Sequence, residues 1–165
     1  MARGDVYYLS VPVDIGPHMA VIVRERDPFV ITIFGQSERR HGAHMVAPND
    51  GVAREFRPHI VRATYFHRNN IALVPMRALP NARIGHIEDD DLPPFLKAAR
   101  EGLALLGQIG EALIAAGHRC QCGGGCKRHI DAPCPKVADP AIGHSVMDWR
   151  ITTRQTIVCR ACWGL

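Results

Sequence analysis

The amino-acid sequence predicts an α+β protein in three parts: a small β-barrel over residues 1–88, an amphipathic helix over residues 89–117 and a cysteine-rich part over residues 118–165. Three observations support this division. Short stretches of β-branched and aromatic residues fill the first half, an apolar repeat with helical spacing follows, and all six cysteines lie in the last part. A chain of 165 residues is long enough to bury a hydrophobic core.

The first part has the pattern of a barrel or sandwich of short strands. Its apolar stretches are separated by residues that favour turns, including a polar turn expected at residues 24–28. Proline cannot donate a ladder hydrogen bond, so Pro12, Pro48 and Pro75 should lie at strand ends or edges. The expected strands cover residues 6–13, 19–23, 29–34, 44–48, 60–66 and 71–76.

The middle part is expected to be one helix that packs on the barrel. Asp91 is the expected N-cap, Pro93 suits the first turn, where a missing N–H costs nothing, and Gly117 is the expected C-terminal cap. Three glycines inside the helix each cost about 1 kcal/mol relative to alanine. We therefore expect them to permit close packing against the barrel or a second subunit. They lie at positions 102, 107 and 110.

The cysteines of the last part have the spacing of a metal site. Two close pairs flank two further thiols, and the glycine run at residues 123–125 allows the backbone to turn tightly around an ion. Disulfides belong mostly to oxidising compartments, and a charge pair at Arg3 and Asp5 stands where a secretory signal needs an apolar region. We therefore predict a cytoplasmic location and a structural zinc ion rather than disulfides. The candidate ligands are Cys120, Cys122, Cys126, Cys134, Cys159 and Cys162.

Ligand counting leaves the number of ions open. One tetrahedral zinc ion takes four ligands, so six cysteines leave two over. Two separate sites would need eight ligands, which requires two of His118, His129 and His144 in addition. The sequence favours one ion that pairs Cys159 and Cys162 with two of the four upstream thiolates, and the spacing does not decide which two. Metal binding should supply much of the folding free energy of this short segment.

The net charge of +4 is unevenly distributed along the chain. Residues 1–88 carry +3, residues 89–117 carry −3 and residues 118–165 carry +4. Two basic ends are consistent with a polyanionic partner, and a solvated surface of mixed charge is the alternative. No apolar run is long enough to span a membrane, so no membrane partner is expected.

Three motifs in the first part resemble segments of the MazF/PemK toxin family. Residues 3–7 (RGDVY) are similar to the start of the family's first strand. Arg77 falls where the family has its "QIRTID" segment, and residues 83–87 (RIGHI) resemble its "RIGxL" segment. Order and spacing agree over roughly residues 3–107. The resemblance implies an SH3-like barrel, usually a homodimer, which in active members cleaves single-stranded RNA without a metal. It also implies a protein antitoxin as a partner.

The same resemblance supplies candidate catalytic residues. His18 stands where the family has a catalytic arginine, and Ser37 falls near its catalytic threonine. Histidine is suited to proton transfer near neutral pH, so His18, Ser37 and Arg39 are the catalytic candidates of an atypical endoribonuclease. Arg39, Arg40 and His41 are the expected phosphate contacts, and His44 lies nearby. The alternative is a barrel that binds RNA without cutting it.

The cysteine-rich part resembles the zinc-binding frame of HNH-type endonucleases over residues 118–163. That family's Asp-His pair and closing histidine are replaced here by the segment from His144 to Asp148 and by Trp163. The expectation is therefore a structural zinc module without nuclease chemistry, with Lys127 and Arg128 as further nucleic-acid contacts. The alternative function is a non-catalytic protein-binding or DNA-binding module of phage or mobile-element type. The basic residues for DNA contact would be Arg119, Lys127, Arg128, Arg150, Arg154 and Arg160.

Overall fold

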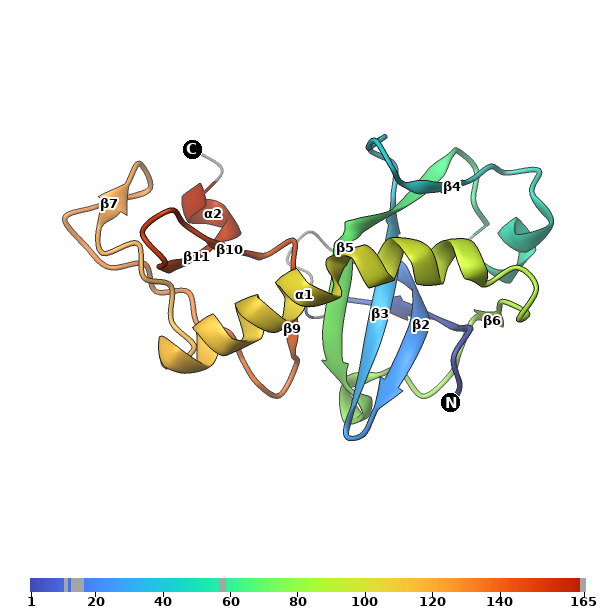
Figure 1. Ribbon diagram of the computed structural model, residues 1–165, viewed down its shortest axis with the longest axis horizontal. Helices are drawn as coiled ribbons and strands as arrows, with labels where there is room; N and C mark the ends of the chain where they lie inside the picture. The colour runs from blue at the N-terminus through green and yellow to red at the C-terminus, as the bar shows by residue number, and fades with distance from the viewer. Residues whose placement is uncertain (11, 13–16, 57–58, 164–165) are drawn as a thin grey trace.

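The structure is a computed structural model that describes residues 1–10, 12, 17–56 and 59–163 (Figure 1). Its first half is a curled antiparallel sheet that forms a half-barrel, one long helix crosses this sheet, and the cysteine-rich part lies beyond the far end of the helix. The α+β class predicted from the sequence is confirmed. No helix among the described residues combines the length and the apolar run that a membrane crossing requires.

The strand order in the main sheet is β4-β5-β3-β2-β1-β6, and β9 pairs with β5. Its strands are β1 (Asp5–Leu9), β2 (His18–Arg26), β3 (Phe29–Gln36), β4 (His44–Val46), β5 (Thr64–Pro75), β6 (Gly85–His86) and β9 (His144–Ser145). Two small hairpins pair β7 (Gly125–Cys126) with β8 (His129–Ile130) and β10 (Trp149–Ile151) with β11 (Ile157–Cys159). The helices are η1 (Gly51–Glu55), η2 (Met76–Ala78), α1 (Pro93–Ala115) and α2 (Arg160–Trp163).

Two features of the predicted strand pattern are wrong. The turn expected at residues 24–28 is shorter, because Arg24, Glu25 and Arg26 continue β2 opposite the start of β3 with their side chains exposed. The strands expected at 60–66 and 71–76 are instead one strand, β5, which begins at Thr64, ends at Pro75 and pairs with β3 on both sides of an irregularity; residues 60–63 are not strand. The expected end of the first strand falls on residues 11 and 13, which lie outside the described part of the chain.

One buried apolar cluster runs through the half-barrel, α1 and the cysteine-rich part. Near its first turn, α1 places Phe95 against Phe66 of β5, with ring centroids 4.8 Å apart in an edge-to-face arrangement. Further along, Leu113 belongs to the same cluster as Trp149 and Ile157. The cysteine-rich part therefore packs on the same helix as the sheet, and β9 adds a strand to β5.

The two ends of α1 differ in how well the sequence predicts them. The N-cap is Leu92 rather than Asp91, because the Leu92 carbonyl accepts the first helical hydrogen bond, from the Leu96 N–H, and no side chain caps the first turn. At the other end, Gly117 follows the C-cap with φ +60°. The N–H of Gly117 donates to Ile114 and that of His118 to Leu113, which is a Schellman motif.

The three glycines of α1 face different surroundings. A Cβ on Gly102 would lie 2.1 Å from the carbonyl oxygen of Arg68 in β5, and one on Gly110 would lie 3.1 Å from the His144 ring. A Cβ on Gly107 would meet nothing within 4 Å. Two of the three glycines thus permit close packing, one against the half-barrel and one against β9.

These surroundings predict opposite effects of two equal substitutions. Gly102→Ala should lower the free energy of unfolding by about 1–3 kcal/mol, because the added methyl forces helix and strand apart. The matched control, Gly107→Ala, should raise it by about 1 kcal/mol, because only helix propensity changes. Urea denaturation followed by circular dichroism measures both. Equal shifts in the two variants would show that Gly102 has no packing role.

Candidate functional site

All six cysteines and one histidine converge in the cysteine-rich part. Among the residues that the structure describes there are two overlapping groups in which every ligand atom lies within 4.8 Å of the others. One group is Cys120, Cys134, Cys159 and Cys162, and the other is Cys122, His129, Cys134 and Cys162. Cys126 adjoins both His129 and Cys162. This Cys/His cluster is a possible metal site.

Local structure explains how distant thiols meet. Cys159 ends β11 and Cys162 lies one turn later in α2, so their sulfurs are 3.6 Å apart. The N–H of Cys159 donates to the sulfur of Cys120 at 3.2 Å, which fixes the upstream segment beside this turn. The sulfur of Cys134 accepts the N–H of Lys136 at 3.4 Å. Backbone donors to sulfur favour the thiolate that a metal requires.

The spacing between sulfurs fits metal coordination better than disulfide bonding. All six cysteines are free, and the Cys120–Cys162 and Cys134–Cys159 sulfur pairs are each 3.7 Å apart. A disulfide bond is only about 2.05 Å long. Two thiolates bound at about 2.3 Å to one tetrahedral ion are roughly 3.8 Å apart. The cluster therefore has the dimensions of a tetrahedral thiolate site.

The thiols differ in how readily they lose a proton. Burial raises the pKa of Cys120 to about 12. Burial, together with neighbouring thiols such as Cys126, also raises the pKa of Cys162. In Cys122 burial acts in the same direction, but hydrogen bonds from backbone groups including Gly124 outweigh it and lower the pKa. A bound divalent cation would stabilise the thiolates that burial disfavours.

The other predicted ligands and nuclease residues have different partners. His144 Nε2 lies 3.2 Å from the carbonyl oxygen of Leu106 in α1, and burial lowers the pKa of this histidine. The buried Asp148 accepts a hydrogen bond from the Ser145 hydroxyl. His118, like His144, belongs to neither group of potential ligands among the described residues. His144 and Asp148 thus fasten this segment within the fold.

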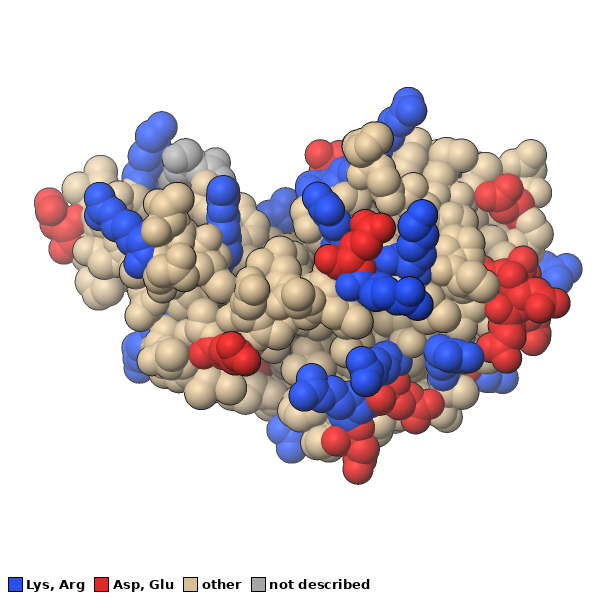
Figure 2. All heavy atoms as spheres, in the orientation of Figure 1, with Lys and Arg blue, Asp and Glu red and all other residues tan. Residues whose placement is uncertain are grey.

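A groove lies between the half-barrel and the cysteine-rich part, and α1 forms its floor. It has a volume of about 1200 Å³, and three arginines of the described residues line it: Arg40 from the half-barrel side, and Arg150 and Arg160 from the opposite side. Glu111 is the acidic residue among its described lining. The notch between the two lobes of the molecule in Figure 2 corresponds to this position, with basic side chains on both lobes.

The groove continues toward the Cys/His cluster. A second hollow of about 470 Å³ shares Arg150 and Trp163 with the groove and is also lined by Arg154 and by Cys126 and Cys162. A basic surface with a partly exposed tryptophan thus leads from Arg40 to the cluster. The sequence analysis named these arginines as separate candidate contacts and did not group them on one surface. It named Trp163 only as the residue that replaces the closing histidine of the HNH family.

The predicted catalytic and phosphate-binding residues of the barrel lie on β2 and on the loop after β3. His18 begins β2, and its ring packs edge-on against Phe34 with centroids 5.8 Å apart. The His44 ring packs in the same way on Phe95, at 4.6 Å. Arg40 pairs with Glu38 at 3.1 Å. Ser37, Arg39 and His41 are exposed on the loop, and Lys127 and Arg128 are exposed at the turn between β7 and β8.

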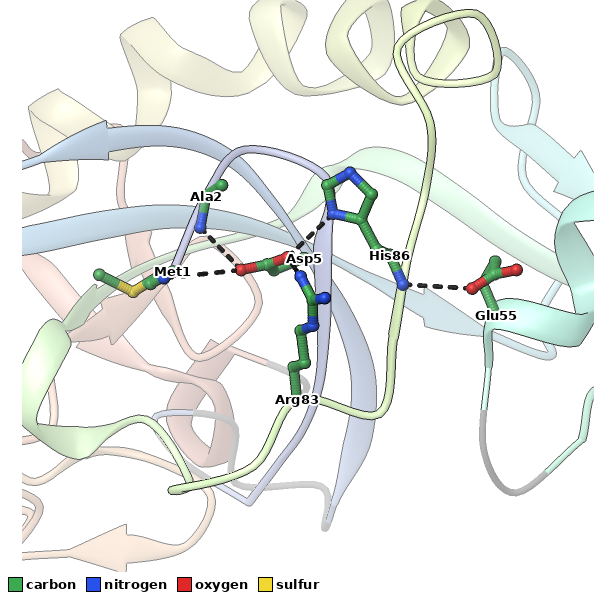
Figure 3. Close-up of polar contacts among 6 residues, drawn as sticks. All are labelled: Met1, Ala2, Asp5, Glu55, Arg83 and His86. Atoms are coloured by element: carbon green, nitrogen blue, oxygen red, sulfur yellow. Dashed lines mark hydrogen bonds and ion pairs between the residues drawn. The ribbon is translucent and has the colours of Figure 1, made fainter.

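A second polar cluster, which the sequence did not predict, joins the first and last motifs of the barrel (Figure 3). Asp5 of β1 is 1% exposed and accepts hydrogen bonds from Arg83 at 2.6 Å and from the Ala2 N–H at 2.7 Å, and its carboxylate lies 2.9 Å from His86 Nδ1. The N–H of His86 donates to Glu55. Strands β1 and β6 pair here, so residues 3–7 and 83–87 are neighbours.

Glycines permit the close approach of the two motifs to each other and of residues 83–87 to η1. A Cβ on Gly85 would lie 1.9 Å from the carbonyl oxygen of Glu55. Gly4 has φ +92°, and a Cβ there would lie 2.4 Å from the carbonyl oxygen of Ile87. The motifs therefore act as a structural clasp, defined by residues 3–7 and 83–87.

Breaking this clasp should cost stability in a pH-dependent way. Burial acts to raise the pKa of Asp5, but hydrogen bonds from His86 and Arg83 outweigh it, so the pKa lies below the ordinary 3.8. The stabilisation is therefore full above pH 3.8 and is lost as the pH falls toward the native-state pKa. Asp5→Asn should lower the free energy of unfolding by about 2 kcal/mol at pH 7.

Urea denaturation at pH 7, 5 and 3 measures this effect. The difference between the wild type and Asp5→Asn should shrink at pH 3. Asp89→Asn is the control, because Asp89 is an exposed partner of Arg3 and should have little effect. A difference that stays constant from pH 7 to pH 3 would contradict the assigned role of the carboxylate.

Comparison of the sequence with known protein families and with curated proteins finds no match. The site is therefore interpreted from its own geometry and chemistry.

Proposed function

We propose that this chain is a zinc-stabilised protein that binds single-stranded RNA in the groove between the half-barrel and the cysteine-rich part. The observation that carries the proposal is the groove itself, which places Arg40, Arg150 and Arg160 around a floor formed by α1. The second hollow extends this surface to Arg154 and Trp163 beside the Cys/His cluster.

Zinc is the ion that the ligand set favours. Thiolate and imidazole ligands suit zinc, whereas magnesium and calcium prefer oxygen. The four cysteines of the first group are the ligands we assign to a structural ion, because sulfurs about 3.7 Å apart match a tetrahedral Zn–S₄ site. The ion would hold β11 and α2 in place, and with them the arginines of one groove wall.

Single-stranded RNA is the polyanion that fits this surface best. Arginine side chains on both walls can neutralise successive phosphates. Trp163 is partly exposed and can stack on an unpaired base, and single strands present unpaired bases without the cost of opening a duplex. Gln108 and Asn69 add amide groups to the lining.

The resemblance to the MazF/PemK family supports the same class of ligand. We infer an SH3-like half-barrel of that type, in which the clasp between residues 3–7 and 83–87 closes the sheet edge. We propose binding rather than cleavage, because the ring of His18, the candidate for proton transfer, packs edge-on against Phe34. Endoribonuclease activity from His18, Ser37 and Arg39 is the second candidate, which the same experiment tests.

The test uses a labelled single-stranded RNA of mixed sequence and the zinc-loaded protein. We expect fluorescence anisotropy to report binding, weaker binding to duplex RNA of the same sequence, and intact RNA on a denaturing gel after prolonged incubation. Cleavage that His18→Ala and Ser37→Ala abolish would favour the endoribonuclease instead. Absence of binding to any nucleic acid would contradict the proposal and favour a protein-binding module.

A further inference from the structure

The cysteine-rich part gathers more ligand atoms than one zinc ion can use. A tetrahedral ion takes four ligands. The cluster, however, contains the sulfurs of all six cysteines and Nδ1 of His129, linked by contacts of 4.0 Å or less. After four cysteines bind a first ion, Cys122, Cys126 and His129 remain together beside it.

We propose that this cluster binds two zinc ions joined by a bridging thiolate, Cys162. The proposal rests on the proposed function only in that the same thiolates bind zinc. Two tetrahedral ions have eight coordination positions, and seven ligands fill all eight when one of them is shared. The first ion takes Cys120, Cys134, Cys159 and Cys162, and the second takes Cys122, Cys126, His129 and Cys162.

Cys162 is the ligand whose position fits a bridge. Its sulfur lies 3.7 Å from that of Cys120 and 3.6 Å from that of Cys159, both in the first group. It also lies 3.5 Å from the sulfur of Cys126 and 3.4 Å from His129 Nδ1, on the other side. Ligands of one tetrahedral zinc ion are roughly 3.8 Å apart for two sulfurs and roughly 3.5 Å for sulfur and nitrogen. All four distances are close to these values.

The hairpin formed by β7 and β8 supplies two ligands of the second ion. Cys126 and His129 are directly opposite each other in its register, so their side chains leave the same face. The Cys126 sulfur is 3.1 Å from His129 Nδ1, and the Cys122 sulfur is 4.0 Å from the same atom. Gly124, at φ +81°, lets the chain turn between Cys122 and this hairpin.

Cys120 and Cys122 lie on the same face of one extended segment, and each contributes its thiolate to a different ion. Gln121 between them is held by β11, because its N–H donates to the Ile157 carbonyl and its side-chain oxygen accepts the Ile157 N–H. Residues on either side of one position in an extended segment have side chains on the same face. The Cys120 sulfur lies beside Cys162, and the Cys122 sulfur lies nearer His129.

Cys134 is the one other residue that belongs to both groups of potential ligands. We assign it to the first ion, because its sulfur lies 3.7 Å from that of Cys159. Two ions also balance the charge better than one, since six thiolates surround them. Lys127 and Arg128, exposed at the turn of the β7–β8 hairpin, add positive charge beside the second ion.

Native mass spectrometry of the zinc-loaded full chain measures the stoichiometry. We expect two zinc ions per chain. One ion per chain would overturn the bridged cluster and leave the structural zinc of the proposed function standing. No bound zinc would overturn both.

Variants and X-ray absorption locate the second ion. Cys122→Ser combined with Cys126→Ser should reduce the zinc content from two ions to one and keep the helical circular dichroism signal. The matched control, His118→Asn, should keep both ions, because His118 lies outside the cluster and asparagine tolerates its φ of +60°. Retention of two ions in the double variant would overturn the proposed ligand set.

The wild-type protein should show zinc–zinc scattering at about 3.8 Å, the separation expected for two ions on one tetrahedral sulfur at about 2.3 Å each. This signal should be absent from the double variant. Because the stoichiometry and the scattering are measured on the wild type, the test holds even if the variant does not fold. Two bound ions without metal–metal scattering would overturn the bridge.

Discussion

A zinc chelator in reducing buffer should abolish the structure of the cysteine-rich part, and this is the largest effect we expect. Structural zinc contributes about 10–16 kcal/mol of binding free energy in small modules. The segment from Cys120 to Cys134 has one hairpin of two-residue strands, which cannot persist without the metal. The half-barrel has a second buried cluster, formed by its own strands together with Met147, and its own strand ladder, so it should remain folded.

Hydrogen exchange measured by mass spectrometry resolves the two regions. We expect rapid exchange over residues 118–143 and 152–163 after chelation, and continued protection in β2, β3 and β5. Protection should be intermediate around β9, which pairs with β5 and packs beside α1. Added zinc should restore the original pattern, and Cys159→Ser should reproduce the chelated state without chelator. Zinc loss with unchanged exchange would contradict a structural role for the metal.

Removal of two arginines from the groove should have the second largest effect. Arg150 and Arg160 are exposed on one wall. If each contributes about 1 kcal/mol through a phosphate contact, Arg150→Ala combined with Arg160→Ala weakens RNA binding roughly 30-fold. Fluorescence anisotropy with labelled single-stranded RNA measures the change.

A matched double variant separates local contacts from net charge. Arg62 and Arg100 are also exposed and do not line the groove. Arg62→Ala combined with Arg100→Ala removes the same charge and should weaken binding only slightly. Equal losses in the two double variants would place the RNA elsewhere on the surface. Zinc content and thermal stability should match the wild type in both.

The order of the secondary structure could be predicted from the sequence, and its long-range pairing could not. Apolar periodicity located α1 and most of the strands, because the burial of one face imposes that period. The strand β9 escaped prediction because two residues, His144 and Ser145, have no detectable period and pair with β5 only after the chain has folded. Asp91 is not the N-cap, because the helical hydrogen bonds begin one residue later, at the carbonyl of Leu92.

In the candidate sites, too, single residues were predictable from the sequence, whereas the contacts between distant residues were not. The Cys/His cluster was largely predictable, since thiols at close spacing are typical of a metal site. His129 could be singled out only by its position opposite Cys126 in a hairpin, which no local pattern revealed. The groove was not predictable, because Arg40 and Arg150 are distant in sequence and α1 brings them to one surface.

The salt dependence of single-stranded RNA binding tests the central claim most directly. Contacts from Arg40, Arg150 and Arg160 to three phosphates predict a slope of about −2 when the logarithm of the association constant is plotted against that of salt concentration. The Arg150→Ala and Arg160→Ala double variant should reduce the slope to about −0.7. A slope near zero for the zinc-loaded wild type, or one that the double variant leaves unchanged, would contradict an RNA-binding groove.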